Sequence, residues 1–600
     1  MRNLQRRRLI RPSRWLATAG PVIVLAMPMA AWSQDDGGVG SAAGGASAES
    51  ASPGSMSTGT GSATASGDSE DEASGLASAI RDSLAGMSGL SFQPGFGQGC
   101  ATSDLSYNAF GGGSIATPLR YAPSPVGSRG RYVQASVAAS ETYTDNLNRD
   151  PGDRAMSDFV TSVAPRIDAC SSTGRVRGEL SYQLQGLVYA NNSRYNDVYN
   201  DISGKTTLSL IENRVYLDAD TRYGQTVVDP GFGYAQSNSL SPNRNKTSAW
   251  VSNISPYVNQ SLGPVGQALL RYRYGRSVYG DADVPESTVN AVYLNVVSPD
   301  TAEPLSWRGN VVTQRVERTG GNQARFFRDN QLDGGDTFTS DGSDPSRTTY
   351  FDRASLELGY QVTQSIRLLG EGGVENDYSN PDGSIDRYSE PFWNAGIRWT
   401  SARNSLEARY GHRFYGSTYS LSARRTGRVM DARIEYREEP TTQGLNTLNG
   451  AGAIGGGGGL GGFNGAGGPT TSLFDRGVFV QKSWSAAVDF NSALTTTTIT
   501  GFRQKREYQQ VDDDNETYQG VDIRTRYDFT PRMALTPQAS WQTRDGNGDF
   551  RGYDSYDAGV ALERALSRSS QAAIGYAHSW RDGTSEYHEN RIAIQFQKSF

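Results

Sequence analysis

Several residue types that define common protein classes are scarce in this chain of 600 residues. With 2 cysteines and 3 histidines, it has too few ligands and bases for a metal site or a Ser-His-Asp triad, so we expect no metal, no cofactor and no catalytic residues. No run of about 18 apolar residues follows the N-terminus, so no membrane-spanning helix is expected in the mature chain. The net charge of -6 forms no basic stripe, which argues against nucleic acid as a partner.

The composition is polar and yet rich in aromatic residues. Only 36% of residues are hydrophobic, whereas 31 are tyrosine, 9 are tryptophan and 70 are glycine. A soluble chain this polar would be partly disordered. A membrane β-barrel has the same statistics for a different reason, because half of each strand faces a wet lumen and aromatic residues form girdles at both interfaces.

The N-terminal part predicts an exported protein with a flexible arm. Residues 1–33 have a basic start, an apolar stretch and a small-residue cleavage site, which are typical of a signal peptide. Residues 34–130 are dominated at first by Gly, Ser, Ala and Thr and predict a low-complexity periplasmic arm. Apolar residues at helical spacing predict one short helix at 76–88 within this arm.

The two cysteines are Cys100 and Cys170. In an oxidising periplasm they are a candidate disulfide, and two unlinked thiols are the equal alternative.

From residue 131 to residue 600 the sequence alternates with a period of two. In Arg175–Ala190, Val176 begins an aliphatic row and Arg177 and Glu179 belong to an ionic row of the opposite parity. Such a strand needs water on one side and hydrocarbon on the other. Similar segments recur along this whole region, so we predict an all-β fold: a transmembrane antiparallel up-and-down β-barrel at 131–600.

The connections between these segments alternate in length. Short turns, such as Thr363–Ser365, alternate with longer connections, such as Gln225–Asn245, as in barrels with short periplasmic turns and long surface loops. The alternation gives about 22 strands, and about 18 or 20 if doubtful hairpins are dropped. Tyr415–Ser417 is the exception, because a tight hairpin stands where a longer loop is expected. Glu438–Asp475 is a Gly-rich connection for which a place on the surface and a fold into the lumen both remain open.

The final strand carries a recognisable pattern. Ile592, Ile594, Phe596 and the terminal Phe600 share one parity. The strand resembles the closing strand of bacterial outer-membrane barrels, which the barrel assembly machinery reads, although Lys598 departs from that pattern. The resemblance implies the outer membrane of a Gram-negative bacterium, with outer-membrane lipid and lipopolysaccharide as neighbours.

A second resemblance lies in the first hairpin. Its segments are Ser140–Asn146 (SETYTDN), Asp158–Val160 and Ala164-Pro165, followed by the strand that begins at Arg175. They resemble the outer-membrane β-barrel family found with PEP-CTERM (exosortase) systems, related to capsular-polysaccharide barrel porins. The resemblance implies a role near exopolysaccharide export, with exopolysaccharide or periplasmic export components as partners.

Charged residues of one parity are the best candidates for a functional surface, and we expect them to line the lumen. Stiffening of the wall by cross-strand ion pairs and conduction of a hydrated polymer are both open roles for them. The predicted lumen-lining residues are Arg175, Arg177, Glu179, Arg214, Asp218, Asp220, Arg222, Arg271, Arg273, Arg353, Glu357, Arg367, Glu371, Arg409, Arg413, Asp522, Arg524 and Arg526.

These observations lead to two functional hypotheses. The first is a conduit or accessory protein for exopolysaccharide export, and the alternative is a non-conducting outer-membrane scaffold or receptor for a periplasmic or surface partner. An enzyme is not expected, because no nucleophile with a neighbouring base is evident.

Overall fold

The computed structural model describes residues 131–229, 240–242, 244–299, 304–322, 325–326, 343–344, 346–380, 389–449, 472–474, 477–508, 515–545, 552–583 and 585–600. The predicted signal peptide, the arm at 34–130 with its helix at 76–88, and Cys100 lie outside these residues. Among the residues described, no helix is long and apolar enough to cross a bilayer.

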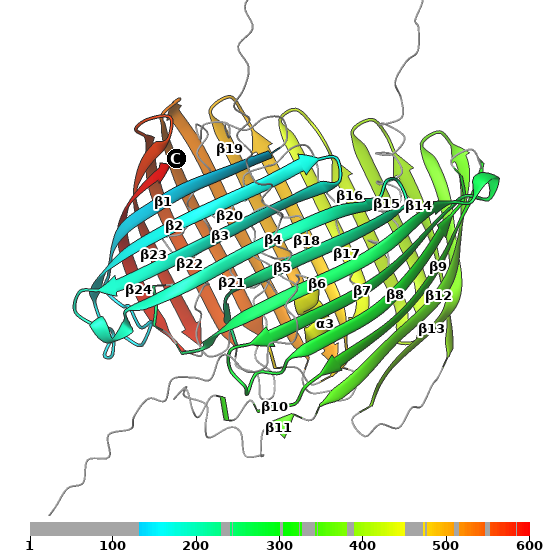
Figure 1. The fold of residues 1–600 in the computed structure, drawn as a ribbon, viewed down its shortest axis with the longest axis horizontal. Helices are drawn as coiled ribbons and strands as arrows, with labels where there is room; N and C mark the ends of the chain where they lie inside the picture. Colours follow the sequence, from blue (N-terminus) through cyan, green and yellow to red (C-terminus); the bar gives the residue numbers. More distant parts are fainter. Residues whose placement is uncertain are drawn as a thin grey trace, which may run out of the picture. The chain divides into compact units, whose positions relative to one another are not determined.

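Twenty-two antiparallel strands form one sheet (Figure 1). The first nine strands are β1 (Arg131–Thr144), β2 (Asp158–Thr173), β3 (Val176–Tyr189), β4 (Asp197–Ile211), β5 (Val215–Val227), β6 (Lys246–Ser261), β7 (Gln267–Tyr279), β8 (Ser287–Val297) and β9 (Leu305–Arg318). The next six are β12 (Arg347–Thr363), β13 (Ile366–Asn380), β14 (Glu390–Thr400), β15 (Asn404–Arg413), β16 (Gly416–Arg425) and β17 (Met430–Thr441). The last seven are β18 (Phe479–Asn491), β19 (Thr495–Tyr508), β20 (Glu516–Thr530), β21 (Met533–Asp545), β22 (Tyr553–Ala565), β23 (Ser570–Gly583) and β24 (Tyr587–Ser599).

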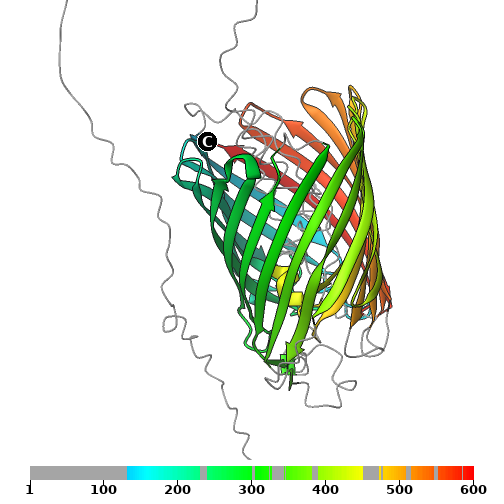
Figure 2. The ribbon, with the colours of Figure 1, turned by 90° about the vertical axis from the view of Figure 1, so that its right-hand side faces the viewer.

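The sheet closes on itself into a barrel. β1 pairs with β24 in a continuous antiparallel register from Ser136 opposite Ser599 to Thr144 opposite Arg591. The amide of Phe600 extends the seam by donating to the carbonyl of Ala135 at 2.9 Å. Because no strand of this sheet keeps a free edge, the backbone groups are satisfied as a bilayer requires. The predicted barrel and its count of 22 strands are therefore confirmed (Figure 2).

Most strands present unlike faces. The shortest barrel strands have 10 residues and the longest has 17, enough to cross the hydrocarbon of a bilayer. On β3, Leu180, Tyr182 and Val188 are exposed on the outer face, whereas the residues between them are largely buried or hydrogen-bonded on the inner face. On β24, Ile592 and Ile594 are likewise exposed outward. Most of the wall is thus apolar outside and polar inside, as in transmembrane barrels.

The connections also follow the predicted alternation. Turns of a few residues join β2 to β3 and β20 to β21 at one end, where both β1 begins and β24 ends. We call this the turn end, and the other the loop end. Longer connections occur at the loop end, and the β9–β12 connection carries the short pair β10 (Gly321–Asn322) and β11 (Ser343–Asp344). Phe414 and Tyr415 alone join β15 to β16, so the exceptional hairpin is real.

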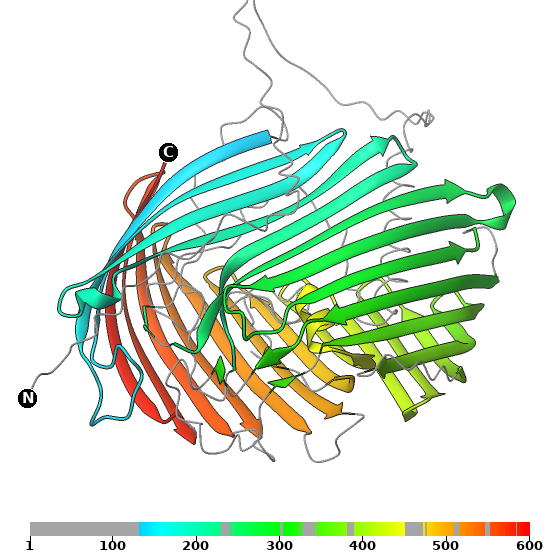
Figure 3. The ribbon, with the colours of Figure 1, turned by 60° about the horizontal axis from the view of Figure 1, so that its bottom comes forward.

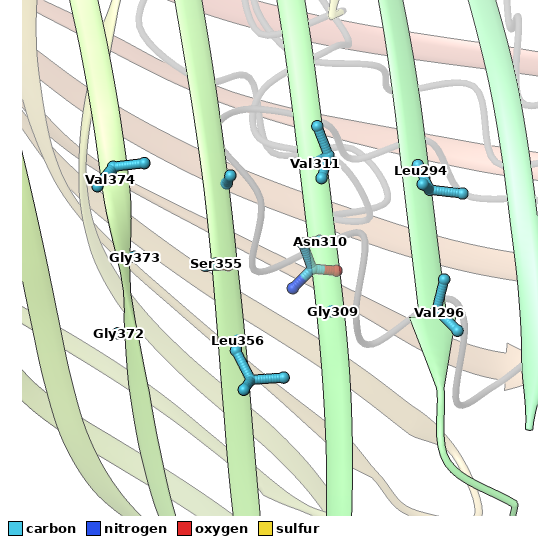
Figure 4. Close-up of a pocket in the computed structure, with 11 residues that line it drawn as sticks. Leu294, Val296, Gly309, Asn310, Val311, Ser355, Leu356, Gly372, Gly373 and Val374 are labelled. Carbon is cyan, nitrogen blue, oxygen red and sulfur yellow. The ribbon is translucent and has the colours of Figure 1, made fainter. Parts of the chain in front are cut away.

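The outer wall has a shallow apolar hollow of about 500 Å³ over β8, β9, β12 and β13. It arises because Gly309 and Gly372 take outward positions between larger side chains, among them Leu294, Val311 and Leu356 (Figure 4). The hollow belongs to the apolar outer face of the barrel.

Candidate functional site: the lumen and helix α3

A short helix lies inside the ring of strands (Figures 2 and 3). This helix, α3 (Gln443–Leu448), belongs to the Gly-rich connection between β17 and β18. Thr442 caps its N-terminus, since its side chain accepts a hydrogen bond from the amide of Leu445 at 3.2 Å. All six helical residues are buried, so the described start of this connection folds into the lumen.

The apolar side of α3 packs against the inner wall. Leu445 and Leu448 are 2% and 3% exposed and join a buried cluster with Val289, Tyr293 and Phe351. The cluster spans the inner faces of β6 to β9 and β12. Burying two leucines in this way stabilises the docked helix by about 1.5–3 kcal/mol each.

The C-terminus of α3 is held by a buried arginine. Arg273 on β7 donates to the carbonyl of Leu448 at 2.8 Å and to Oδ1 of Asn449 at 2.6 Å. Asn253 on β6 supplies a second donor to the same carbonyl, at 3.1 Å, and also accepts from Arg273. A guanidinium at this position satisfies the last carbonyls and complements the negative end of the helix dipole.

The opposite side of α3 contacts the facing wall. Arg506 on β19 donates to Oε1 of Gln443 at 2.8 Å, and Asn446 donates to Oε1 of Gln481 on β18 at 2.8 Å. Around the ring, nine strands (β8, β9 and β12–β18) separate β7 from β19 on one side and eleven (β20–β24 and β1–β6) on the other. Helix α3 therefore bridges nearly opposite walls and divides the lumen.

One division of the lumen is lined by paired charges on β12 to β15, which we call the charged lane. Arg353 pairs with Glu371 at 2.9 Å, and Arg409 pairs with Glu357 at 2.5 Å and with Glu407 at 2.6 Å. These side chains keep between 10% and 26% of their surface exposed. Cross-strand ion pairs of this kind connect strands of the wall.

At the loop end, the connections fold over the barrel. Asp229, directly beyond β5, accepts from Arg544 on β21 at 3.1 Å, and Arg544 also reaches Glu516 on β20 at 3.3 Å. All three side chains are at most 2% exposed. Leu473 and Phe474, from the end of the β17–β18 connection, pack with apolar residues of three other connections.

A second ion pair fixes the first connection at this end. Arg149 donates to Glu589 on β24 at 2.8 Å. Burial acts to lower the pKa of the Arg149 guanidinium, but Tyr587 and Glu589 together raise it above its ordinary value. Arg149 is therefore charged at every physiological pH, and its ion pair ties the β1–β2 connection to β24.

The predicted lumen-lining residues on strands lie on the inner face. Among them, Asp218 and Arg271 pair at 2.8 Å, and Arg413 pairs with Glu375. Two of the predicted residues need correction. Arg175 and Arg214 lie in the turns β2–β3 and β4–β5 rather than on the wall, because β3 begins one residue after Arg175 and β5 begins one residue after Arg214. The other predicted residues also lie on the inner face of the barrel, and they are Arg177, Glu179, Asp220, Arg222, Arg273, Arg353, Glu357, Arg367, Glu371, Arg409, Asp522, Arg524 and Arg526.

The other candidate residues are placed as follows. Ile592, Ile594 and Phe596 face outward on β24, and their role as an assembly signal stays a prediction. Cys170 lies on the inner face of β2, opposite Tyr132, and is disulfide-bonded, and Cys100 is the one other cysteine of the sequence. Within the described residues, no group of three or more His, Cys, Asp or Glu side chains is arranged to hold a metal ion.

The apolar patch on the inner wall that receives α3 was not predicted from the sequence. The patch centres on β8, whose Val289, Ala291 and Tyr293 face inward while Val292 and Leu294 face outward. A strand that is apolar on both faces departs from the alternation of its neighbours. In a barrel with a wet lumen, that departure is the signal of an inward-folded element.

Comparison with known proteins assigns the chain to no family. No model of a protein family matches the sequence, and no curated protein matches it. Among solved structures, it is similar to the FrpB iron transporter from Neisseria meningitidis (F5-1 variant, apoprotein), with 10% identity, 78% of this chain and 81% of that chain covered, and a TM-score of 0.46. It is also similar to the siderophore receptor PirA from Pseudomonas aeruginosa, with 8% identity, 78% and 80% covered, and a TM-score of 0.41. The ferric-catecholate import receptor Fiu from E. coli K12 matches with 9% identity, 78% and 81% covered, and a TM-score of 0.42. Likeness at this level assigns no residue of this chain a role.

Proposed function

We propose that this protein is an outer-membrane barrel that conducts hydrated solutes through a lumen narrowed by α3. The single observation that carries the proposal is the position of α3, wedged between β7 and β19 by apolar packing on one wall and hydrogen bonds on the other. A surface connection that merely covered the barrel would need neither contact. A helix that is fixed across the lumen limits the width of the passage through the barrel.

The charged lane supports a polymer or sugar as the solute. Its Arg and Glu side chains are paired with each other, so a passing solute is not held by an uncompensated charge. Guanidinium and carboxylate groups that keep some exposure can exchange weak hydrogen bonds with hydroxyl groups. A segment of neutral or weakly charged polysaccharide fits this chemistry, and exopolysaccharide export is the finer form of the proposal.

A receptor or scaffold that does not conduct is the second candidate. It is favoured by the loop end, where Arg544 joins Asp229 and Glu516 in a buried triad that holds a connection over the lumen. The two candidates differ in one property, which is whether solute passes through the lumen of the barrel. No catalytic step belongs to either.

Planar-bilayer recording of the mature protein tests the proposal. We expect small, steady channels with weak preference for ion sign, and a larger conductance in Arg273→Ala, which releases the C-terminus of α3. Arg276→Ala is the matched control, because Arg276 lies on the same strand but points outward and pairs with Glu286. Absence of current in both the mature protein and Arg273→Ala would contradict conduction and leave the receptor candidate.

A further inference from the structure

The inner faces of the barrel wall are not equally exposed. On β16, inward-facing Ser420 is half-exposed and Ser422 is exposed, as expected beside a wet lumen. Across the seam of the barrel, inward side chains are almost completely buried: Thr142, Gln185 and Ala593 are 0% exposed. Small side chains on a concave wall would be exposed to water in the lumen unless another part of the chain covered them.

We call this buried surface the arm seat and define it by six residues on β1, β2, β3 and β24: Ser140, Thr142, Ala164, Ser181, Gln185 and Ala593. Among the described helices and strands, β1 and β2 have substantial contact only with their neighbours in the sheet, and β3 adds only the turn η1 (Ser193–Tyr195). Leu147 and Leu240 cover residues at the loop end, such as Val160 and Tyr189. Ser181 lies opposite Asp168, eight residues along β2 from Val160, so these two leucines do not cover it.

The chemistry of the arm seat suits a peptide backbone. Oγ1 of Thr142, Oγ of Ser181 and Oε1 of Gln185 are buried and have no hydrogen-bond partner among the described residues. Buried polar atoms in proteins are normally satisfied, so these atoms point to a hydrogen-bonding occupant. The alanines beside them let that occupant approach closely, as a Gly- and Ser-rich chain can.

From these observations we propose that the arm seat binds the protein's own N-terminal arm, residues 34–130, inside the lumen. The arm joins β1 at Arg131, at the turn end of one of the seat strands. Since β1 has 14 residues, about as many extended arm residues, at about 3.3 Å each, run the full length of the seat. A second copy or a foreign peptide would have to compete with a segment that is already tethered at this point.

Cys170 agrees with this placement. It lies on the inner face of β2, opposite Tyr132 and Glu179, toward the turn end of the same wall. Cys170 is disulfide-bonded, and Cys100 in the arm is the one other cysteine of the sequence, so this bond would fix the arm in the lumen rather than outside it. The proposal does not depend on conduction, because it concerns one side of the lumen while the charged lane lies on the other.

Chemical labelling of the full mature chain tests the proposal. Ser140→Cys is nearly isosteric, and we expect a water-soluble maleimide to label it at least about tenfold more slowly than Ser422→Cys, as for a site that opens only transiently. Peptide-resolved mass spectrometry measures both rates with the native cysteines retained. Equal labelling of the two positions would overturn the proposal.

Photo-crosslinking then identifies the occupant. A benzophenone amino acid replaces Gln183, which faces inward beside Gln185 on β3, and the same substitution at Ser422 is the control. We expect crosslinks from position 183 to peptides of residues 34–130 and none from position 422. Crosslinks from position 183 only to another protein, or only to the described barrel, would assign the seat to a different occupant and overturn the proposal. A loss of conduction affects neither readout, so this proposal and the proposed function fail separately.

Discussion

Release of α3 from the inner wall is the perturbation with the clearest expected effect. In Leu445→Ala/Leu448→Ala, both side chains that anchor the helix are shortened. Each is at most 3% exposed in the cluster around β8. Leu→Ala at such sites costs about 2–5 kcal/mol each, and neighbouring sites are not additive, so about 4 kcal/mol is a conservative total.

A loss of about 4 kcal/mol changes the ratio of docked to undocked helix by roughly 10³. The strands keep their own hydrogen bonds, so the loss is expected as undocking and not as unfolding of the barrel. We expect a larger single-channel conductance in planar bilayers, with heat-modifiable mobility on gels unchanged. Leu270→Ala, on the lipid-facing side of β7 and 49% exposed, is the matched control and should conduct like the native protein. An unchanged conductance in the double variant would refute the constriction.

Three further predictions concern single contacts. Thr442→Ala removes the N-cap of α3 and should raise conductance less than the double variant, because a cap is worth about 1 kcal/mol; single-channel recording measures the difference. Arg544→Ala leaves the carboxylates of Asp229 and Glu516 uncompensated, so we expect it to lower the free energy of unfolding of the barrel by about 3–5 kcal/mol in a urea titration. An unchanged midpoint would argue against a buried triad. Glu371→Gln leaves Arg353 without its carboxylate, so reversal potentials in a salt gradient should shift toward anion preference, and a shift toward cations would contradict the charged lane.

The barrel could be predicted from the sequence because its cause is local. A strand between hydrocarbon and water must alternate, and Arg175–Ala190 shows the alternation without any knowledge of its neighbours. The order of short and long connections added the strand count. Only the exact strand ends were wrong, and Arg175 and Arg214 therefore lie in turns.

The interior could not be predicted in the same way, because its contacts are far apart in sequence. Arg273 was expected to line the lumen, but nothing local indicates that it holds the carbonyl of Leu448. The apolar inner face of β8 is the one sequence signal, since Val289 and Tyr293 are out of place beside water. Even that signal does not say which segment covers them.

A disulfide trap tests the position of α3 most directly. A Cβ added at Gly444 would lie 2.7 Å from Cβ of Ser287 on β8, which is about 1 Å closer than a disulfide requires, so a small shift of the helix allows Gly444→Cys/Ser287→Cys to form a disulfide under mild oxidation in the membrane. Gly444→Cys/Ser422→Cys, with the second cysteine on inward-facing β16, is the control. We predict a bond in the first pair and none in the second. A trapped bond to β16, or equal trapping in both pairs, would show that α3 does not dock on β8 and would contradict a lumen divided by this helix.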